Sequence, residues 1–256
     1  MTRSRDAQDP VALVAGGAIV TGILLAWELS ADSSVTVRLL LSSPLRTCAY
    51  VAQHLAEAGQ AFLYTGLESL LGLVVATVFA LVFGIACIYY PRAGSISFPL
   101  LVASQVIPLV CLAPMIILVF GPGPSGKVFL SALIAFFPIL TNVISGIRSV
   151  ASAPQEMMRI MAAPKAQVIR HVVIPHCTEH FFAGLRIAAP LSVIGAIVAE
   201  FNGADIGIGK DIFISAKRLE PELMMSGILA GAILSGLIYG VVLLLERRLG
   251  PWYWER

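Results

Sequence analysis

Two short patterns in this sequence combine residues that could do chemistry, and the first suggests phosphate binding. Residues 121–127 read Gly-Pro-Gly-Pro-Ser-Gly-Lys, which fits the G-x-x-x-x-G-K part of a phosphate-binding loop. Val128 follows Lys127, so the hydroxyl that would hold Mg²⁺ is missing. Pro122 and Pro124 have no N–H to donate to a phosphate. The pattern therefore predicts a turn and not a nucleotide site.

The second pattern is a group of metal-binding residue types, His171, His176, Cys177 and His180. His176 and His180 are one helical turn apart, a spacing that can hold zinc. Pro175 is expected to disturb the helix there, and the sequence offers no evident fourth ligand. We therefore expect surface histidines and no metal site. No catalytic set of Ser, His and Asp and no H-E-x-x-H motif occurs, so the sequence does not predict an enzyme.

Polar residues within long hydrophobic runs are costly in a membrane and are often functional. The candidates for a polar translocation pathway are Gln105, Pro108, Thr141, Asn142 and Ser145. A proline within a span exposes carbonyl groups that protein or water must satisfy. Ordinary hydrogen bonding between helices explains each polar residue equally well, so both interpretations stay open.

Three charged residues also fall close to hydrophobic runs. Glu68 and Glu200 are expected near the outer ends of their helices, where a carboxylate still reaches water. Arg186 is expected near an inner end, where its long side chain can extend to the interface.

The composition identifies the environment in which these residues must be placed. Hydrophobic residues make up 58% of the 256, and charged residues only 12%, against about 25% in a soluble domain. The mean hydropathy is +0.89. The net charge of +2 is too small to indicate nucleic acid binding. The chain is therefore expected to be an all-α integral membrane protein in a lipid bilayer.

A spanning helix needs about 20 mainly apolar residues. Six segments qualify: 11–29, 61–89, 98–120, 128–147, 183–200 and 223–245. The distribution of Lys and Arg places residues 1–10, the segment 148–182 and the tail 247–256 in the cytoplasm. TM2–TM4 then occupy 61–147, and TM5–TM6 occupy 183–246.

The segments outside the membrane differ in character. Residues 30–60 contain an amphipathic stretch that suits an interfacial helix. Residues 201–222 contain three glycines and are expected to form a flexible return loop. In the second span Gly72, Ala76, Ala80 and Gly84 recur every four residues, which favours close helix packing within the chain over a subunit interface.

The polar segment 152–175 interrupts the hydrophobic runs. Ser152 and Gln155 form a capping box, and a short helix over 153–162 is expected to end at Pro164. A second helix over 164–173 is expected to stop before Pro175. The first helix presents methionines, which suit a groove on a partner protein. The alternative is a surface helix folded back on its own bundle.

This segment resembles the cytoplasmic loop of the permease subunits of type I ABC importers, in the group that includes taurine, aliphatic sulfonate, nitrate and thiamine-precursor systems. Their loop has the form E-A-A, three residues, G, nine residues, I-x-L-P. The matching positions are Glu156, Met157, Met158, Ala162, Val172, Ile174 and Pro175. Similar segments follow the same order at 120–127, 136–142, 184–186, 199–200, 207–209 and 246–252, so the resemblance covers residues 41 to 256.

The resemblance implies a subunit that forms the translocation pathway without a catalytic centre. ATP and Mg²⁺ would be bound by a cytoplasmic ABC ATPase dimer, and this chain would bind no cofactor. A second permease subunit, expected to be a copy of the chain, and an external substrate-binding protein would complete the transporter in a bacterial inner membrane. The residues implied in ATPase coupling are Glu156, Met157, Met158, Arg159, Met161, Ala162 and Pro175.

Two positions depart from the family pattern. Ala162 stands where the loop has the glycine of a sharp turn, and Glu68 stands where relatives commonly have arginine. The substrate is expected to be a small anionic or heterocyclic solute, of the sulfonate, nitrate, taurine or pyrimidine type. An ATP-independent transporter, which would usually show inverted repeats, and an integral membrane enzyme are the alternatives.

Overall fold

Proline marks where several helices begin. Pro44, Pro91, Pro114 and Pro124 each lie in the first turn of a helix, where an N–H has no helical acceptor in any case. The computed structural model describes residues 10–249, apart from residues 32, 35, 36, 38–40, 151–155 and 159. Every regular element in this described part is a helix, which confirms the expected all-α class.

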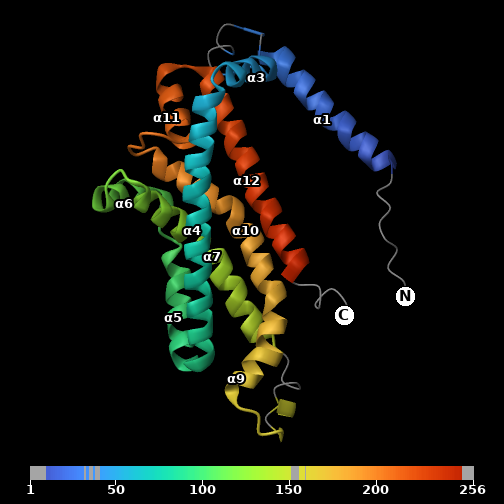
Figure 1. Cartoon of the computed structure of the whole chain (residues 1–256), viewed down its shortest axis with the longest axis vertical. Helices are drawn as coiled ribbons and strands as arrows, with labels where there is room; N and C mark the ends of the chain where they lie inside the picture. The colour runs from blue at the N-terminus through green and yellow to red at the C-terminus, as the bar shows by residue number, and fades with distance from the viewer. Residues whose placement is uncertain are drawn as a thin grey trace. The chain divides into compact units, whose positions relative to one another are not determined.

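The helices follow one another with short connections (Figure 1). They are α1 (Pro10–Ala31), α3 (Pro44–Gln53), α4 (Leu55–Tyr89), α5 (Pro91–Ser104), the 3₁₀ helix η1 (Leu109–Leu112), α6 (Ala113–Phe120), α7 (Pro124–Ser149), α9 (Lys165–Val168), the π-helix η2 (Ile169–Val173), α10 (Ile174–Glu200), α11 (Ile208–Arg218) and α12 (Pro221–Leu249).

Four helices of the described chain are long and apolar enough to cross a membrane. They are Leu55–Tyr89, Pro124–Ser149, Ala166–Glu200 and Pro221–Leu249. The third of these joins most of α9 to η2 and α10 without a break. The expected spans 61–89, 128–147, 183–200 and 223–245 lie within these four helices, and 11–29 lies within α1.

The expected span 98–120 is not a single helix. Helix α5 ends at Ser104, and the backbone N–H groups of Gln105 and Val106 each bond back only three residues, to Val102 and Ala103. Pro108 follows in an extended conformation, because proline has no N–H and disfavours helix in the residue before it. Helix α6 then begins afresh, so the third hydrophobic segment is a broken one.

The chain divides into two units, and the smaller comprises residues 1–58 and 211–229. Within it α1 is joined to α3 by two hydrogen bonds. The Trp27 indole N–H donates to the Ser42 carbonyl at 3.1 Å, and the Glu28 carboxylate accepts from the Leu45 N–H at 3.1 Å. Ser43 caps α3 by accepting the Arg46 N–H. The expected interfacial segment 30–60 therefore contains α3 and the beginning of α4.

The larger unit comprises residues 59–210 and 230–256, and α4, α7 and α10 pack in it through glycines. A Cβ on Gly184 would come within 2.9 Å of the Pro138 carbonyl oxygen, and one on Gly195 within 2.7 Å of the Ser131 Cα. Gly72 also faces Ser131, and Gly84 faces Val143. The expected small-residue face of α4 is thus buried within the chain, where backbones approach closely.

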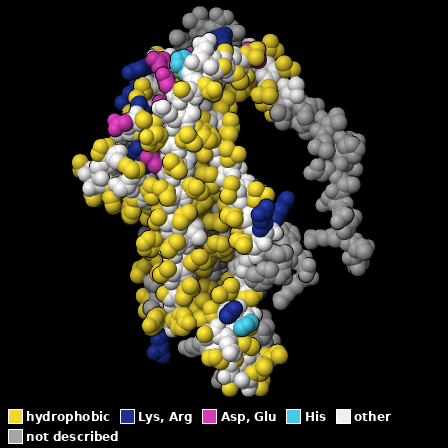
Figure 2. Space-filling model, viewed as in Figure 1, with side chains coloured by type: hydrophobic (Ala, Val, Ile, Leu, Met, Phe, Trp, Pro, Cys, Tyr) yellow, Lys and Arg dark blue, Asp and Glu magenta, His cyan; other side chains and the backbone are white. Residues whose placement is uncertain are grey.

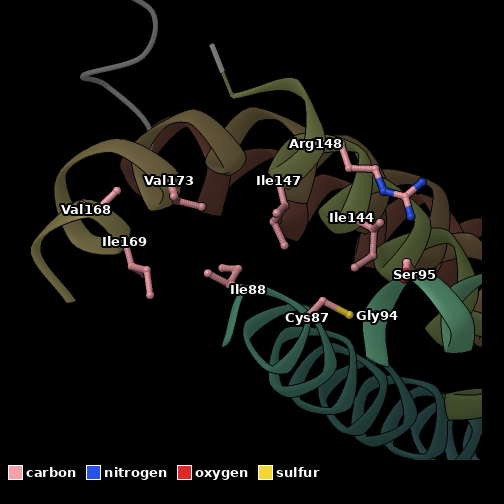
Figure 3. A pocket seen from close by; sticks show the side chains of 10 residues that line it. All are labelled: Cys87, Ile88, Gly94, Ser95, Ile144, Ile147, Arg148, Val168, Ile169 and Val173. Carbon is pink, nitrogen blue, oxygen red and sulfur yellow. The ribbon is translucent and has the colours of Figure 1, made fainter. Parts of the chain in front are cut away.

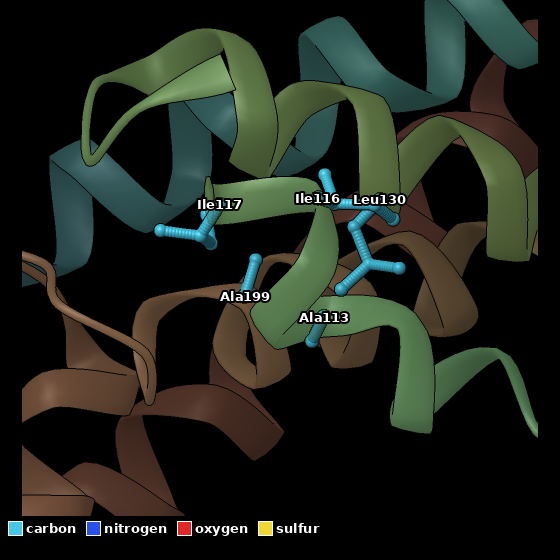
Figure 4. Close-up of a cluster of buried hydrophobic side chains, with 5 residues drawn as sticks. All are labelled: Ala113, Ile116, Ile117, Leu130 and Ala199. Atoms are coloured by element: carbon cyan, nitrogen blue, oxygen red, sulfur yellow. The ribbon is translucent and has the colours of Figure 1, made fainter. Parts of the chain in front are cut away.

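A cluster of buried side chains joins α6, α7 and α10 in this unit. Ala113, Ile116, Ile117, Leu130 and Ala199 pack together (Figure 4). On the outside, α4 and α5 present a continuous hydrophobic surface (Figure 2). An apolar exterior of this kind suits a lipid bilayer, because apolar side chains can face its hydrocarbon core without the cost of contact with water.

The segment 201–222 is not the flexible return loop that its glycines suggest. Residues 208–218 form the helix α11, with Asp211 in its first turn and Lys217 and Arg218 in its last. These charges oppose the partial charges of the helix ends. A shorter turn, residues 201–207, makes the connection from α10.

Candidate functional site

The polar segment forms a short helix followed by a left-handed turn. Residues 156–158 and 160 are helical, and Ala162 has a φ of +51°. The Ala163 N–H donates to the Met158 carbonyl at 3.0 Å, the bond that closes a helix whose next residue is left-handed. Ala162 therefore makes the turn for which the family pattern has glycine, at a cost of about 1–2 kcal/mol.

Ala162→Gly is expected to stabilise this turn. Glycine removes the left-handed strain but adds backbone freedom to the unfolded segment, so the net gain is about 0.5–1 kcal/mol. Hydrogen exchange of the amide at position 163 should slow about two- to fivefold. Ala163→Gly, next to it at a position without positive φ, should have the opposite effect, and equal rates in the two variants would contradict the assignment.

The sequence suggested that the second helix of the segment stops before Pro175. In the structure the helix continues through this proline. Helix α9 passes into the π-helix η2, and the Ile174 N–H bonds to the Ile169 carbonyl five residues back. Helix α10 continues from there with Pro175 in its first turn. Pro175 has no N–H to donate to a carbonyl of the preceding turn. The wider π turn rearranges these carbonyls and so accommodates the proline.

The residues implied in ATPase coupling differ in exposure. Met157 and Met161 are 64% and 67% exposed, and Ile160 is 86% exposed. Glu156 is also exposed, whereas Met158 is half-buried. Arg159 and the capping residues Ser152 and Gln155 lie outside the described residues. Exposed apolar side chains on a polar segment are typical of a surface that binds a partner.

The expected pathway residues do not form one group. Gln105 and Pro108 are exposed at the break between α5 and η1, and Ser145 is exposed on α7. Thr141 donates to the carbonyls of Phe137 and Pro138, and the Asn142 amide donates to Pro138. These last two side chains hydrogen-bond within their own helix, so their place on a pathway remains a prediction.

The turn predicted over residues 121–127 is confined to 121–123, and Pro124 to Lys127 form the first turn of α7. Gly121 has a φ of +81° at the end of α6, and Gly123 precedes α7. Lys127 is buried, and its ammonium lies 3.0 Å from the Glu68 carboxylate. The lysine of the apparent phosphate loop is therefore engaged in an ion pair.

Glu68 and Glu200 do not reach water, contrary to expectation. Glu68 is 3% exposed and Glu200 only 1%. Glu200 accepts hydrogen bonds from the Thr65 hydroxyl at 2.7 Å and the Gly209 N–H at 2.6 Å. The Thr65 hydroxyl in turn accepts the Ile208 N–H at 2.9 Å. These bonds fasten the 201–209 turn to α4 and α10.

The buried ion pair and the Glu200 network meet on α4, because Thr65, which bonds Glu200, lies three residues before Glu68. One carboxylate oxygen of Glu68, Oε2, is buried without a hydrogen-bond partner in the described chain. Glu68 thus has an acceptor in excess of its single cation, Lys127. Glu68 is thus paired with a lysine of α7 inside this chain.

Arg186 also has a partner that its sequence context did not reveal. Its Nε lies 3.5 Å from the Glu246 carboxylate, and its side chain is one-third exposed. The pair joins α10 to α12, so Arg186 does not simply extend to the membrane interface. Glu246 lies within the 246–252 segment that resembles the family.

A cavity of about 440 Å³ adjoins the polar segment, between the ends of α4, α5 and α7 and the π-helix η2. In Figure 3, Ile147, Ile144 and Ile169 point into it, and Arg148 and Ser95 lie together at one side. The Arg148 guanidinium also stacks 4.9 Å over the Phe98 ring of α5. The cavity makes a mostly apolar space next to the segment implied in coupling.

The family described as binding-protein-dependent transport system inner membrane component matches residues 80–255. The chain therefore belongs to this family, the membrane permeases of type I ABC importers.

Individual relatives agree with the family assignment. Formylaminopyrimidine transport permease protein ThiX of Halalkalibacterium halodurans is 30% identical over 239 residues, which cover 90% of this chain and 92% of the relative. A putative aliphatic sulfonates transport permease protein SsuC of Bacillus subtilis is 27% identical, covering 92% and 87%. Taurine transport system permease protein TauC of Escherichia coli is 27% identical, covering 73% and 68%. The chain is thus an ABC transporter permease of the membrane.

Proposed function

We propose that this chain forms the translocation pathway of an ABC importer and that residues 156–175 dock on a cytoplasmic ATPase dimer. The chain would cross the inner membrane six times, with both termini in the cytoplasm. The broken segment around Pro108 and helix α1 would supply the two spans beyond the four long helices. ATP and Mg²⁺ would be bound by the ATPase and not by this chain.

The observation that carries the proposal is the exposed apolar surface of Met157, Ile160 and Met161 next to the left-handed turn at Ala162. The turn separates the short helix from α9 and leaves its apolar side chains without partners in the described chain. Flexible apolar side chains suit insertion into a partner's groove. Movement of the ATPases would then reach α10 directly, because α9, η2 and α10 form one helix.

The docking role predicts that charge on this surface separates the two proteins. Met157→Asp combined with Ile160→Asp should lower co-purification of the transporter's ATPase at least about tenfold, since buried apolar contacts dominate such interfaces. Substrate uptake should fall with it. Met157→Leu with Ile160→Leu keeps the surface apolar and serves as the matched control. Normal ATPase recovery and uptake in the aspartate variant would rule out docking through this surface.

The remaining parts of the transporter are proposed from the family. Two copies of the chain would enclose the pathway, and an external binding protein would deliver the substrate. The relatives named for formylaminopyrimidine, aliphatic sulfonates and taurine support a small anionic or heterocyclic solute. Ligand identification on the binding protein, followed by ATP-dependent uptake in proteoliposomes, tests this. Uptake by the chain alone would identify an ATP-independent transporter instead.

A further inference from the structure

Two imidazoles of α10 converge on one hydroxyl at the end of α7. The Ser149 Oγ lies 3.1 Å from the His176 Nε2 and 3.2 Å from the His180 Nε2. The two ring centroids are 6.0 Å apart. A Cβ on Gly146 would come within 2.9 Å of the His180 Cβ, so α10 approaches α7 closely here. Two imidazole nitrogens of α10 therefore lie close to one hydroxyl of α7, and all three atoms are potential metal ligands.

The hydrogen bonds of this group limit where its protons can lie. A serine hydroxyl has one hydrogen to donate and two lone pairs. The Ser149 hydroxyl donates to the Gly146 carbonyl at 3.0 Å, and its two lone pairs can accept an Nε2–H from each imidazole in the tautomer that is protonated there. A neutral imidazole carries one proton, which either nitrogen can hold. Moving both protons to Nδ1 leaves two Nε2 lone pairs directed at the same small space.

We propose that His176, His180 and Ser149 form a binding site for a divalent transition-metal ion of the Zn²⁺ or Ni²⁺ type. Two histidines four residues apart on one helix face are a zinc-binding arrangement, and imidazole suits these borderline ions. Zn–N bonds are about 2.0–2.1 Å long, so ligands that share one ion lie about 3–3.5 Å apart, close to the 3.1 and 3.2 Å between the Ser149 Oγ and each Nε2. Water completes the coordination.

Two further features favour a cation at this position. Ser149 is the last residue of α7, where the unpaired carbonyls of a helix end carry partial negative charge. His176 and Ser149 are exposed, so an ion has access from solvent. Among the described residues no group of three or more His, Cys, Asp or Glu side chains could hold a metal. The proposed site has only two such residues, and its third ligand is the Ser149 hydroxyl.

The site would join the two ends of the segment that separates α7 from α10. A bound ion would replace two hydrogen bonds by coordination bonds from both helices. This inference does not depend on the coupling role proposed above, because it concerns metal binding by the isolated chain.

The test is a titration of the full-length chain, purified in detergent with an affinity tag that contains no histidine, with Ni²⁺ and separately with Zn²⁺ by calorimetry. One saturable equivalent per chain is expected. His176→Ala and His180→Ala should each abolish it, and Ser149→Ala should weaken it by about tenfold. His171→Ala and Cys177→Ser are the matched controls and should leave it unchanged.

Ser149→His provides a test by gain of affinity. A third imidazole in place of the hydroxyl should strengthen binding at least about tenfold, since imidazole is a better ligand for these ions than a hydroxyl. Identical gel-filtration profiles of the variants show that the fold is retained. The proposal is overturned if the wild-type chain binds neither ion saturably, or if binding survives in both histidine variants.

Discussion

Lys127→Met should lower the free energy of unfolding of this protein by about 3–5 kcal/mol, because it leaves a buried carboxylate without its cation. The Lys127 ammonium is 3.0 Å from the Glu68 carboxylate, and both side chains are less than 10% exposed. Unfolding by SDS in mixed micelles, followed by circular dichroism, measures the change.

The double variant Glu68→Gln with Lys127→Met removes both charges and should recover most of the loss, because a neutral pair of similar volume is often as stable as a buried ion pair. Lys217→Met is the matched control. Lys217 is exposed and contacts the Phe213 ring at 4.0 Å, an interaction worth at most about 1 kcal/mol at the surface. Equal effects of the two lysine variants would contradict a buried ion pair.

The second large effect is expected at Gly209, where any side chain collides with α10. A Cβ there would overlap the Ile197 carbonyl oxygen and come within 2.9 Å of the Glu200 Cβ. The turn must move, which breaks the 2.6 Å bond from the Gly209 N–H to the Glu200 carboxylate. Overpacking and the lost charged hydrogen bond together should cost Gly209→Ala about 2–4 kcal/mol.

Two variants separate these contributions, in the same unfolding assay. Thr65→Val has nearly the same shape but removes the hydroxyl that bonds Glu200 and the Ile208 N–H, and should cost about 1–3 kcal/mol. Gly236→Ala places a methyl in open space on α12 and should be neutral or slightly stabilising. A Gly209→Ala variant as stable as Gly236→Ala would show that the turn is not held as described.

Local patterns predicted much of the helical architecture. Apolar runs of sufficient length located the four long helices, and the prolines of residues 121–127 indicated a turn, which the structure confines to 121–123. The recurrence of Gly72, Ala76, Ala80 and Gly84 identified a packing face, because small residues act through spacing along one helix. Pro108 accounts for the break in the third segment, as its place within the expected span indicated.

Long-range contacts could not be predicted in the same way. The sequence shows Glu68 and Lys127 as isolated charges near helix ends, and only the packing of α4 on α7 pairs them. Ser149 lies 27 residues from His176, so the spacing of the two histidines does not predict that this hydroxyl lies close to both. The helix α11 was missed because the glycines before it indicated flexibility, and the Glu200 carboxylate that orders the turn comes from α10.

By itself, the sequence determined that this is an all-helical membrane protein with a polar segment of the permease type, because hydropathy and motif spacing are local properties of the chain. Only the tertiary structure decided which polar groups are buried and what satisfies them. A buried charge must find its partner wherever the fold supplies one, and that partner is set by helix packing and not by position along the chain. The left-handed turn at Ala162 was likewise decided by the tertiary structure, which places it between the short helix and the long helix that includes α10.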